Sequence, residues 1–223
     1  MHKSSILRMQ WFASEYLKNK SMKKVLDVGS LDINGSYRSI FDDNFEYTGL
    51  DLVIGKNVDI CVKNPYHWNM IESNYYDVVI SGQALEHSAF FWVLFAEIIR
   101  VTKKNGIICI IVPRGFHKHR YPIDCWRFLE DGMTSLANYY GLEMLHCHTN
   151  SAPSPYHINW FSKNNADTMM VAQKPYDGIA QTIDTRKYQP VSYHQNYLPE
   201  GWFKFPFDGS LLQSLYNLLR GQS

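Results

Sequence analysis

Short apolar runs with strand character alternate with helical segments along most of this 223-residue chain, and this alternation constrains the fold most strongly. The clearest runs are Tyr76–Ser81 (YDVVIS) and Ile107–Val112 (IICIIV), and Phe90–Thr102 between them has the spacing of an apolar helix. Runs that are apolar at nearly every position are typical of strands buried on both faces. The pattern predicts an α/β three-layer sandwich with a mostly parallel, seven-stranded sheet and helices on both faces.

The remaining elements follow from the same rules. Ser4–Asn19 has apolar residues at three- and four-residue spacing and predicts an amphipathic helix. Asp131–Tyr140 predicts another helix, and we expect Pro113 to break the strand that precedes it. The other predicted strands are Lys23–Asp27, Glu46–Leu50, Asn57–Val62, Glu143–Thr149 and Thr168–Gln173.

The chain divides by character near residue 174. We expect residues 1–174 to form one domain that begins with the helix in residues 1–20, and residues 175–223 to form an aromatic-rich extension. Leu211–Leu219 within the extension has helical apolar spacing. Three roles stay open for the extension: packing on the domain, covering the acceptor pocket as a lid, or joining two copies in a homodimer.

Composition excludes several classes of protein. Lys and Arg (22) nearly balance Asp and Glu (21), which argues against a nucleic-acid partner held by bulk charge. The sequence shows no signal-peptide pattern and no apolar run of the roughly 20 residues that a membrane span needs. We therefore expect a cytoplasmic protein. The four cysteines lack CxxC spacing and are expected to be buried thiols.

Two acids and a glycine mark a candidate nucleoside site. Asp27-Val28-Gly29 ends one predicted strand, and Asp51 ends the next. The glycine lets the backbone approach a ligand, and the Asp51 carboxylate can accept hydrogen bonds from ribose hydroxyls. The loop from Gly29 to Gly35 is not GxGxxG, which disfavours NAD. Asp27 would also repel a diphosphate, whereas it suits a cationic ligand such as S-adenosylmethionine.

The ordered set of these motifs resembles the class I S-adenosylmethionine-dependent methyltransferases, in particular the small type 11-like enzymes common in metabolic and glycan pathways. The resemblance runs from about Lys23 to Pro113. It is carried by Val25–Ser30, Gly49–Asp51, Tyr76–Ser81, Leu85–His87 and Glu97–Val101.

The resemblance implies a role for each part of the cofactor site. The loop of Gly29 and Ser30 cradles the methionine part, Asp51 holds the ribose and Leu52 packs on adenine. The loop that contains Lys63 and Asn64 caps the adenine edge. Residues beneath the methionine and the sulfonium are Ser81, Gly82 and Gln83.

Other residues near these motifs are given structural roles. Asp77 is expected to accept hydrogen bonds from loop amides. Asn64-Pro65-Tyr66 superficially matches a motif of amino-methylating enzymes, but it precedes the fourth strand instead of following it. Glu86-His87 could bind a divalent metal, yet no second acidic cluster accompanies it, so we favour a structural role in which His87 bonds a backbone group and no metal is bound.

A polar segment after Ile107–Val112 is the candidate acceptor site, because ligands of α/β sheets bind at the carboxyl ends of the strands. The segment contains a His-x-His pair, an Asp, two Arg and a Trp between His117 and Arg127. His119–Pro122 and Asp124–Phe128, with Gly35–Arg38 and Ser81–Ala84 upstream, resemble a narrower subfamily encoded among polysaccharide-biosynthesis functions. This resemblance implies O-methylation of a sugar or oligosaccharide.

A sugar hydroxyl is a poor nucleophile, so a group must take its proton as the methyl group is transferred. We expect His119 to be the general base, with His117 as a second candidate and Asp124 as the orienting carboxylate or the acceptor of a second hydroxyl. Residues expected to bind the acceptor are Arg120, Tyr121, Trp126 and Arg127.

Alternatives remain for the loop and for the function. Asp124 and Arg127 could instead form an internal salt bridge, with Trp126 and Phe128 in the core. A methyltransferase of quinones or other small aromatics would need a more apolar acceptor pocket. A non-catalytic scaffold that binds S-adenosylmethionine would predict a damaged cofactor site, yet Asp27, Gly29 and Asp51 are all present.

Overall fold

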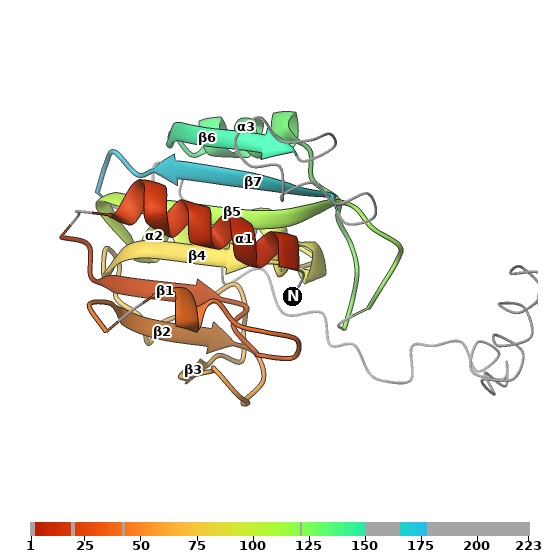
Figure 1. Cartoon of the computed structure of the whole chain (residues 1–223), viewed down its shortest axis with the longest axis horizontal. Helices are drawn as coiled ribbons and strands as arrows, with labels where there is room; N and C mark the ends of the chain where they lie inside the picture. Colours follow the sequence, from red (N-terminus) through yellow and green to blue (C-terminus); the bar gives the residue numbers. More distant parts are fainter. Residues whose placement is uncertain (1–2, 19–20, 42, 121, 150–165, 178–223) are drawn as a thin grey trace, which may run out of the picture. The chain divides into compact units, whose positions relative to one another are not determined.

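The computed structural model describes residues 3–18, 21–41, 43–120, 122–149 and 166–177 (Figure 1). Seven strands form one sheet in the order β3-β2-β1-β4-β5-β7-β6. Among them β7 pairs antiparallel with β5 and β6, and the remaining pairs are parallel. The strands are β1 (Lys24–Val28), β2 (Glu46–Asp51), β3 (Ile60–Cys61), β4 (Tyr76–Gly82), β5 (Thr102–Gly115), β6 (Glu143–Thr149) and β7 (Ala166–Gln173).

Helices cover both faces of the sheet. Helix α1 crosses the front in Figure 1, over the central strands, whereas α2 and α3 lie behind the sheet. This arrangement confirms the predicted fold class. The helices are α1 (Lys3–Phe12), which continues into the π-helical turn η1 (Ala13–Leu17), α2 (Phe91–Val101), α3 (Glu130–Tyr139) and the short 3-10 turns η2 (Arg38–Ile40) and η3 (Leu85–His87).

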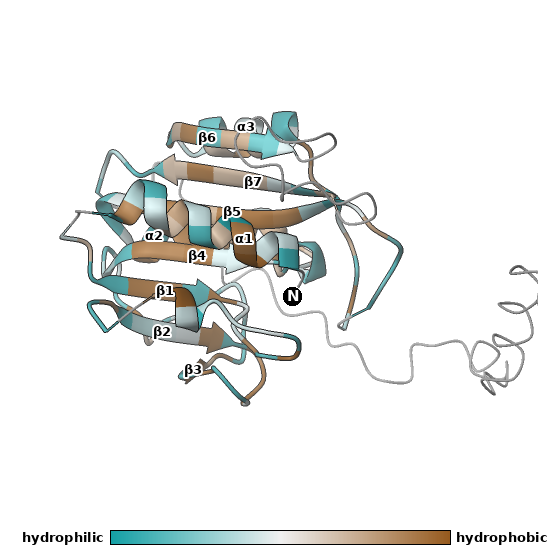
Figure 2. Ribbon diagram, in the orientation of Figure 1, coloured by the Kyte–Doolittle hydropathy of each residue, from teal (hydrophilic) through white to brown (hydrophobic). Residues whose placement is uncertain are grey.

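Successive residues of the central strands point to opposite faces of the sheet, so there is one hydrophobic core on each face. Val78, Ile107 and their neighbours pack toward α1, while the next residue of each strand packs toward α2 and α3. Since both sets are apolar, the central strands are hydrophobic along their length (Figure 2). This double burial explains why the strands read as continuous apolar runs.

Two local expectations differ from the structure. Pro113 does not break its strand, since β5 runs on to Gly115. Pairing with β4 ends at Ile111, so at Pro113 strand β5 has a neighbour only on the β7 side. A proline, which lacks an N–H group, is tolerated at such a position. The run Asn57–Val62 contributes only two strand residues, because its first part forms a turn, with Asn57 at φ 71°.

Asp77, the cysteines and the helix lengths can also be compared with the predictions. Asp77 accepts hydrogen bonds from the amides of Lys23 (3.1 Å) and Lys24 (2.9 Å), as expected. The cysteines are not uniformly buried, because Cys61 and Cys125 lie exposed in or beside loops. None of the helices in the described part of the chain has the length and apolarity needed to cross a bilayer.

Candidate active site

The loops after β1, β2 and β4 meet at the carboxyl edge of the sheet. The amide of Gly29, directly after β1, donates to the carbonyl of Leu50 in β2 (2.9 Å). Gly29 has φ 82°, and a Cβ there would lie 2.5 Å from the Cβ of Ala84. The turn therefore needs glycine for both its backbone conformation and its close contact with the segment after β4.

Asp51, the last residue of β2, connects two loops of this edge. One carboxylate oxygen accepts from the amide of Leu31 (3.0 Å), and the other from the amides of Leu52 (2.7 Å) and Val53 (3.3 Å). Ser30 adds a second connection, since its hydroxyl donates to the carbonyl of Asn57 (3.1 Å). A carboxylate is thus held in a fixed position at the end of β2.

Exposed apolar side chains lie beside Asp51. Leu52 is 45% exposed, Val53 58% and Ile54 82%, and Ile33 in the loop after β1 is 62% exposed. Large apolar groups in water are unfavourable, and a group of them beside a polar anchor is typical of a ligand site. Such a surface suits the flat face of an adenine.

The loop after β3 lies next to the same residues. The amide of Val62 donates to the carbonyl of Asp51 (2.9 Å), which places Lys63 and Asn64 close to the end of β2. Lys63 is exposed, whereas the side chain of Asn64 accepts from the amide of Tyr66 (2.8 Å) and shapes the turn.

Asp27 is positioned differently from the expectation. Its side chain is buried in β1 and accepts a hydrogen bond from the hydroxyl of Tyr47 on β2, so it is enclosed within the sheet and not open to a ligand. Burial raises the pKa of Asp27 to about 7, although the bond from Tyr47 opposes this change.

The end of β4 and the residue after it use their side chains inside the fold. The Ser81 hydroxyl donates to the carbonyl of Val28 (2.8 Å), and the Gln83 amide donates to Asp167 (3.1 Å). A Cβ on Gly82 would lie 1.9 Å from the hydroxyl of Tyr37. What Ser81, Gly82 and Gln83 can offer a cofactor is therefore mainly backbone.

A buried ion pair that the motif analysis missed holds this segment to α1. Asp167 on β7 accepts from Arg8 (3.1 Å) and Ser4 (3.3 Å) in addition to Gln83, and Arg8 and Asp167 are almost fully buried. Burial lowers the pKa of Arg8, and the charge of Asp167 opposes that change. In the sequence, the feature that indicates this pair is Asp167, an acidic residue next to the apolar residues of β7.

The acceptor loop, residues 116–128 after β5, is closed by an ion pair. Asp124 binds Arg127 through two contacts (2.5 and 2.8 Å) and also accepts from the amide of His119 (2.7 Å). Arg127 donates further to the carbonyl of His117 (3.3 Å). The Arg127 guanidinium holds the pKa of Asp124 well below its usual range, so Asp124 is an anion.

The structure thus uses the proposed acceptor-binding residues in different ways. Arg127 forms the internal salt bridge that was one of the two alternatives. Trp126 donates to the carbonyl of Ser88 (2.8 Å) and packs edge-on against Phe91, as the core alternative predicts. Arg120 is exposed, and Tyr121 lies outside the described residues.

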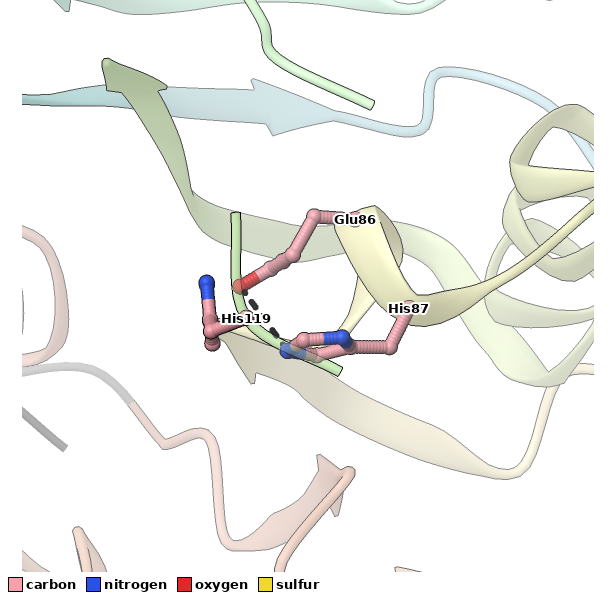
Figure 3. Close-up of side chains that lie close together, drawn as sticks. All are labelled: Glu86, His87 and His119. Atoms are coloured by element: carbon pink, nitrogen blue, oxygen red, sulfur yellow. Dashed lines mark ion pairs between the residues drawn. The ribbon is translucent and has the colours of Figure 1, made fainter. Parts of the chain in front are cut away.

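His119 meets Glu86 and His87 across the edge of the sheet (Figure 3). The rings of His119 and His87 are perpendicular with centroids 5.0 Å apart, and Nε2 of His87 lies 3.6 Å from Oε1 of Glu86. Nδ1 of His87 donates to the carbonyl of Ile123, which is the backbone bond expected of it. The same two segments are joined by the amide of Cys125, which donates to the carbonyl of Glu86 (2.8 Å).

Part of the chain is similar to a known protein family. Residues 14–110 match a family profile described as a methyltransferase domain. No match is found among curated proteins.

Many solved structures share the fold. A putative methyltransferase from Bacillus halodurans is 14% identical, with 78% of this chain and 100% of that chain covered and a TM-score of 0.57. The 1,6-didemethyltoxoflavin-N1-methyltransferase of Burkholderia thailandensis, solved with S-adenosylhomocysteine, is 15% identical over 77% and 79% of the chains, with a TM-score of 0.58. The [4+2]-cyclase SpnF is 16% identical over 76% and 81%, with a TM-score of 0.57.

The strand order and the family match agree. Seven strands in this order form the class I methyltransferase fold, and residues 14–110 match a methyltransferase domain. The likeness to a cyclase shows that the fold alone does not define the reaction. The acceptor must therefore be argued from the site.

Proposed function

We propose that this S-adenosylmethionine-dependent methyltransferase methylates a hydroxyl of a sugar in a glycan or glycan precursor. The supporting observation is the acceptor loop, which brings His119 beside Glu86 and His87 at the carboxyl edge and is held there by the Asp124–Arg127 ion pair. A histidine near an anionic carboxylate, in a loop of polar residues, suits a hydroxyl acceptor better than an apolar ring.

The donor would bind on the other part of the edge. In this proposal the backbone of Gly29 and Ser30 receives the methionine part, and Asp51 accepts from the ribose after exchanging some of its amide contacts. Leu52 supplies an apolar face for adenine. The outer rim comprises Lys63 and Asn64, and the floor comprises Ser81, Gly82 and Gln83, with Asp27 supporting the β1 end from below.

Methyl transfer is an in-line displacement, so the site mainly aligns the two reactants and accepts one proton. The acceptor oxygen bonds to the methyl carbon, the carbon–sulfur bond breaks, and the sulfur leaves as a neutral thioether. His119 takes the hydroxyl proton. Asp124, whose Oδ2 lies 3.6 Å from Nδ1 of His119, stabilises the resulting imidazolium, and His117 is the second candidate for the base.

The polar side chains of the acceptor loop favour a sugar over an aromatic acceptor. Exposed Arg120 can donate to sugar hydroxyls or to a phosphate of a carrier, as can Arg127 if its pair with Asp124 opens. Tyr121 is the remaining residue of the proposed acceptor set, whereas the contacts of Trp126 place it in the core. A quinone would need an apolar opening, but the ring of Trp126 is directed into the cluster of Phe91 and Trp92.

A transfer assay with labelled S-adenosylmethionine across free sugars, nucleotide sugars, oligosaccharides and quinones tests the proposal. We expect label in a sugar class only. His119→Ala should reduce turnover about 10²- to 10⁴-fold, the usual contribution of a general base, while binding of S-adenosylhomocysteine stays unchanged. Label only in quinones would refute the sugar acceptor, and full turnover by His119→Ala would remove the base.

A further inference from the structure

Three metal-binding side chains converge at one point of the carboxyl edge. Glu86 and His87 come from turn η3, and His119 comes from the acceptor loop (Figure 3). One donor atom of each lies within 4.8 Å of the others. Since 31 positions of chain separate His87 from His119, only the folded chain brings them together.

Glu86 is the unusual member of this group. Its side chain is fully buried, and neither carboxylate oxygen has a hydrogen-bond partner. A buried carboxylate without a donor is strongly unfavourable unless a proton or a cation compensates it. These two oxygens therefore require either a proton or a cation.

The histidines present suitable lone pairs. A carbonyl oxygen can only accept, so Nδ1 of His87 carries the hydrogen in its bond to Ile123, and the lone pair of the neutral ring is on Nε2. Nε2 is the atom that lies 3.6 Å from Glu86. Nε2 is thus the ring atom of His87 that faces the Glu86 carboxylate and can bind a metal ion.

His119 repeats the arrangement from the other side. Its Nδ1 lies 3.2 Å from the carbonyl of His117 and 3.6 Å from Asp124. Metal-binding histidines commonly donate their second ring N–H to a carbonyl or a carboxylate, which orients the ring and increases its basicity. Both histidines of the group have such a partner in place.

We propose that Glu86, His87 and His119 bind a divalent transition-metal ion, in contrast to the structural role that the sequence favoured for Glu86-His87. Two imidazoles and one carboxylate suit Zn²⁺, Mn²⁺ or Fe²⁺ and leave coordination positions open. Ligands about 2.1 Å from such an ion lie about 3 to 3.5 Å apart. The Glu86–His87 pair has nearly that spacing, so a small approach of the acceptor loop completes the site.

The role of the ion rests on the proposed function, whereas its binding does not. An open position can take the acceptor hydroxyl and make it more acidic. The hydroxyl proton then leaves to solvent, the oxygen–carbon bond forms as the carbon–sulfur bond breaks, and the sulfur departs as a thioether. When the ion is bound, His119 is a ligand, and this role replaces the base role proposed for it above.

Calorimetric titration of Zn²⁺, and separately of Mn²⁺, into the EDTA-treated full chain tests the site. We expect one ion per chain for at least one of the metals. Glu86→Gln keeps the size of the side chain and removes its charge, and should weaken binding at least about 100-fold, more than the loss of an outer-shell partner. His119→Gln, a change in the loop and outside the core, should do the same.

His148→Gln is the matched control, because Nδ1 of His148 forms a similar pair with Glu130 (3.5 Å) outside the group. It should bind the metal as the wild type does. No metal binding by the wild type would overturn the site. Metal binding by Glu86→Gln and His119→Gln that is as tight as that of the wild type would also overturn it. Metal binding that depends on Glu86 in a protein that methylates no sugar would refute the proposed acceptor and leave the site standing.

Discussion

The donor and acceptor parts of the carboxyl edge are built by different means. The donor part is made of backbone turns, in which Gly29 and Gly82 have no room for a side chain and Asp51 is held by three amides. The acceptor part is made of side chains from separate segments, with the Asp124–Arg127 pair and the group of Glu86, His87 and His119.

The two parts differ because local backbone sterics determine the first and the tertiary placement of side chains determines the second. Steric requirements of turns act within a few residues, so they leave motifs that can be recognised along the chain. Side-chain groups depend on how the loops are placed, and their members can be far apart in sequence. Changes in the donor part should therefore affect cofactor binding and stability, and changes in the acceptor part should affect the loop and the acceptor.

Asp51→Ala should give the largest change in the donor part. Loss of a charged hydrogen-bond acceptor for the ribose corresponds to about 1.5–3 kcal/mol, or about 10- to 150-fold weaker binding of S-adenosylhomocysteine by calorimetry. Asp43→Ala, at an exposed position before β2, is the control and should bind normally. Unchanged affinity in Asp51→Ala would contradict the ribose assignment.

Gly82→Ala should destabilise the fold by about 1–3 kcal/mol, because the new methyl group must displace the buried ring of Tyr37. Chemical denaturation measures the free energy of unfolding. Gly115→Ala is the matched control, since its Cβ would meet nothing within 4 Å. Equal stability of the two variants would show that the end of β4 has more room than the structure indicates.

Asp27→Asn should change how stability depends on pH. The folded pKa of about 7 lies above the ordinary 3.8, so the folded state binds the extra proton between these values. The stabilisation from this proton is complete below pH 3.8 and is lost as pH rises through 7, by at most about 1.4 kcal/mol per pH unit.

Unfolding of both proteins in urea at pH 5 and pH 8 measures this effect. The asparagine variant should gain stability relative to the wild type as pH rises, because its side chain can still accept from Tyr47 without a charge. A constant difference between the two proteins at both pH values would argue against a raised pKa for Asp27.

Arg127→Met should give the smallest effect and act only on the acceptor loop. The variant removes the partner of Asp124, which should then hold the amide of His119 less firmly. Because the pair is partly exposed, we expect about tenfold faster hydrogen exchange at that amide and unchanged binding of S-adenosylhomocysteine. Unchanged or slower exchange would mean that the Asp124–Arg127 pair does not hold the loop. A loss of cofactor binding would mean that the acceptor and donor parts of the edge are not independent.

Much of the fold was predictable because the central strands are buried on both faces. Tyr76–Ser81 and Ile107–Val112 are apolar on both faces and therefore suit a covered sheet. The first prediction matches β4 to within one residue, whereas the second covers only the middle of β5. Pro113 misled the prediction, since its effect depends on which strands flank it. Asp27 was recognised as part of the motif, but its enclosure by Tyr47 on the neighbouring strand depends on sheet register.

The sequence by itself determined the alternation of strands and helices, the glycine turn after β1 and the acid at the end of β2, because each depends on local conformation or on a periodic burial pattern. Tertiary structure decided what the polar side chains do. It paired Asp124 with Arg127, buried Glu86 without a donor, and placed His119 beside it. The physical reason is that the charge and proton state of such groups depend on neighbours and burial that form only when distant segments meet.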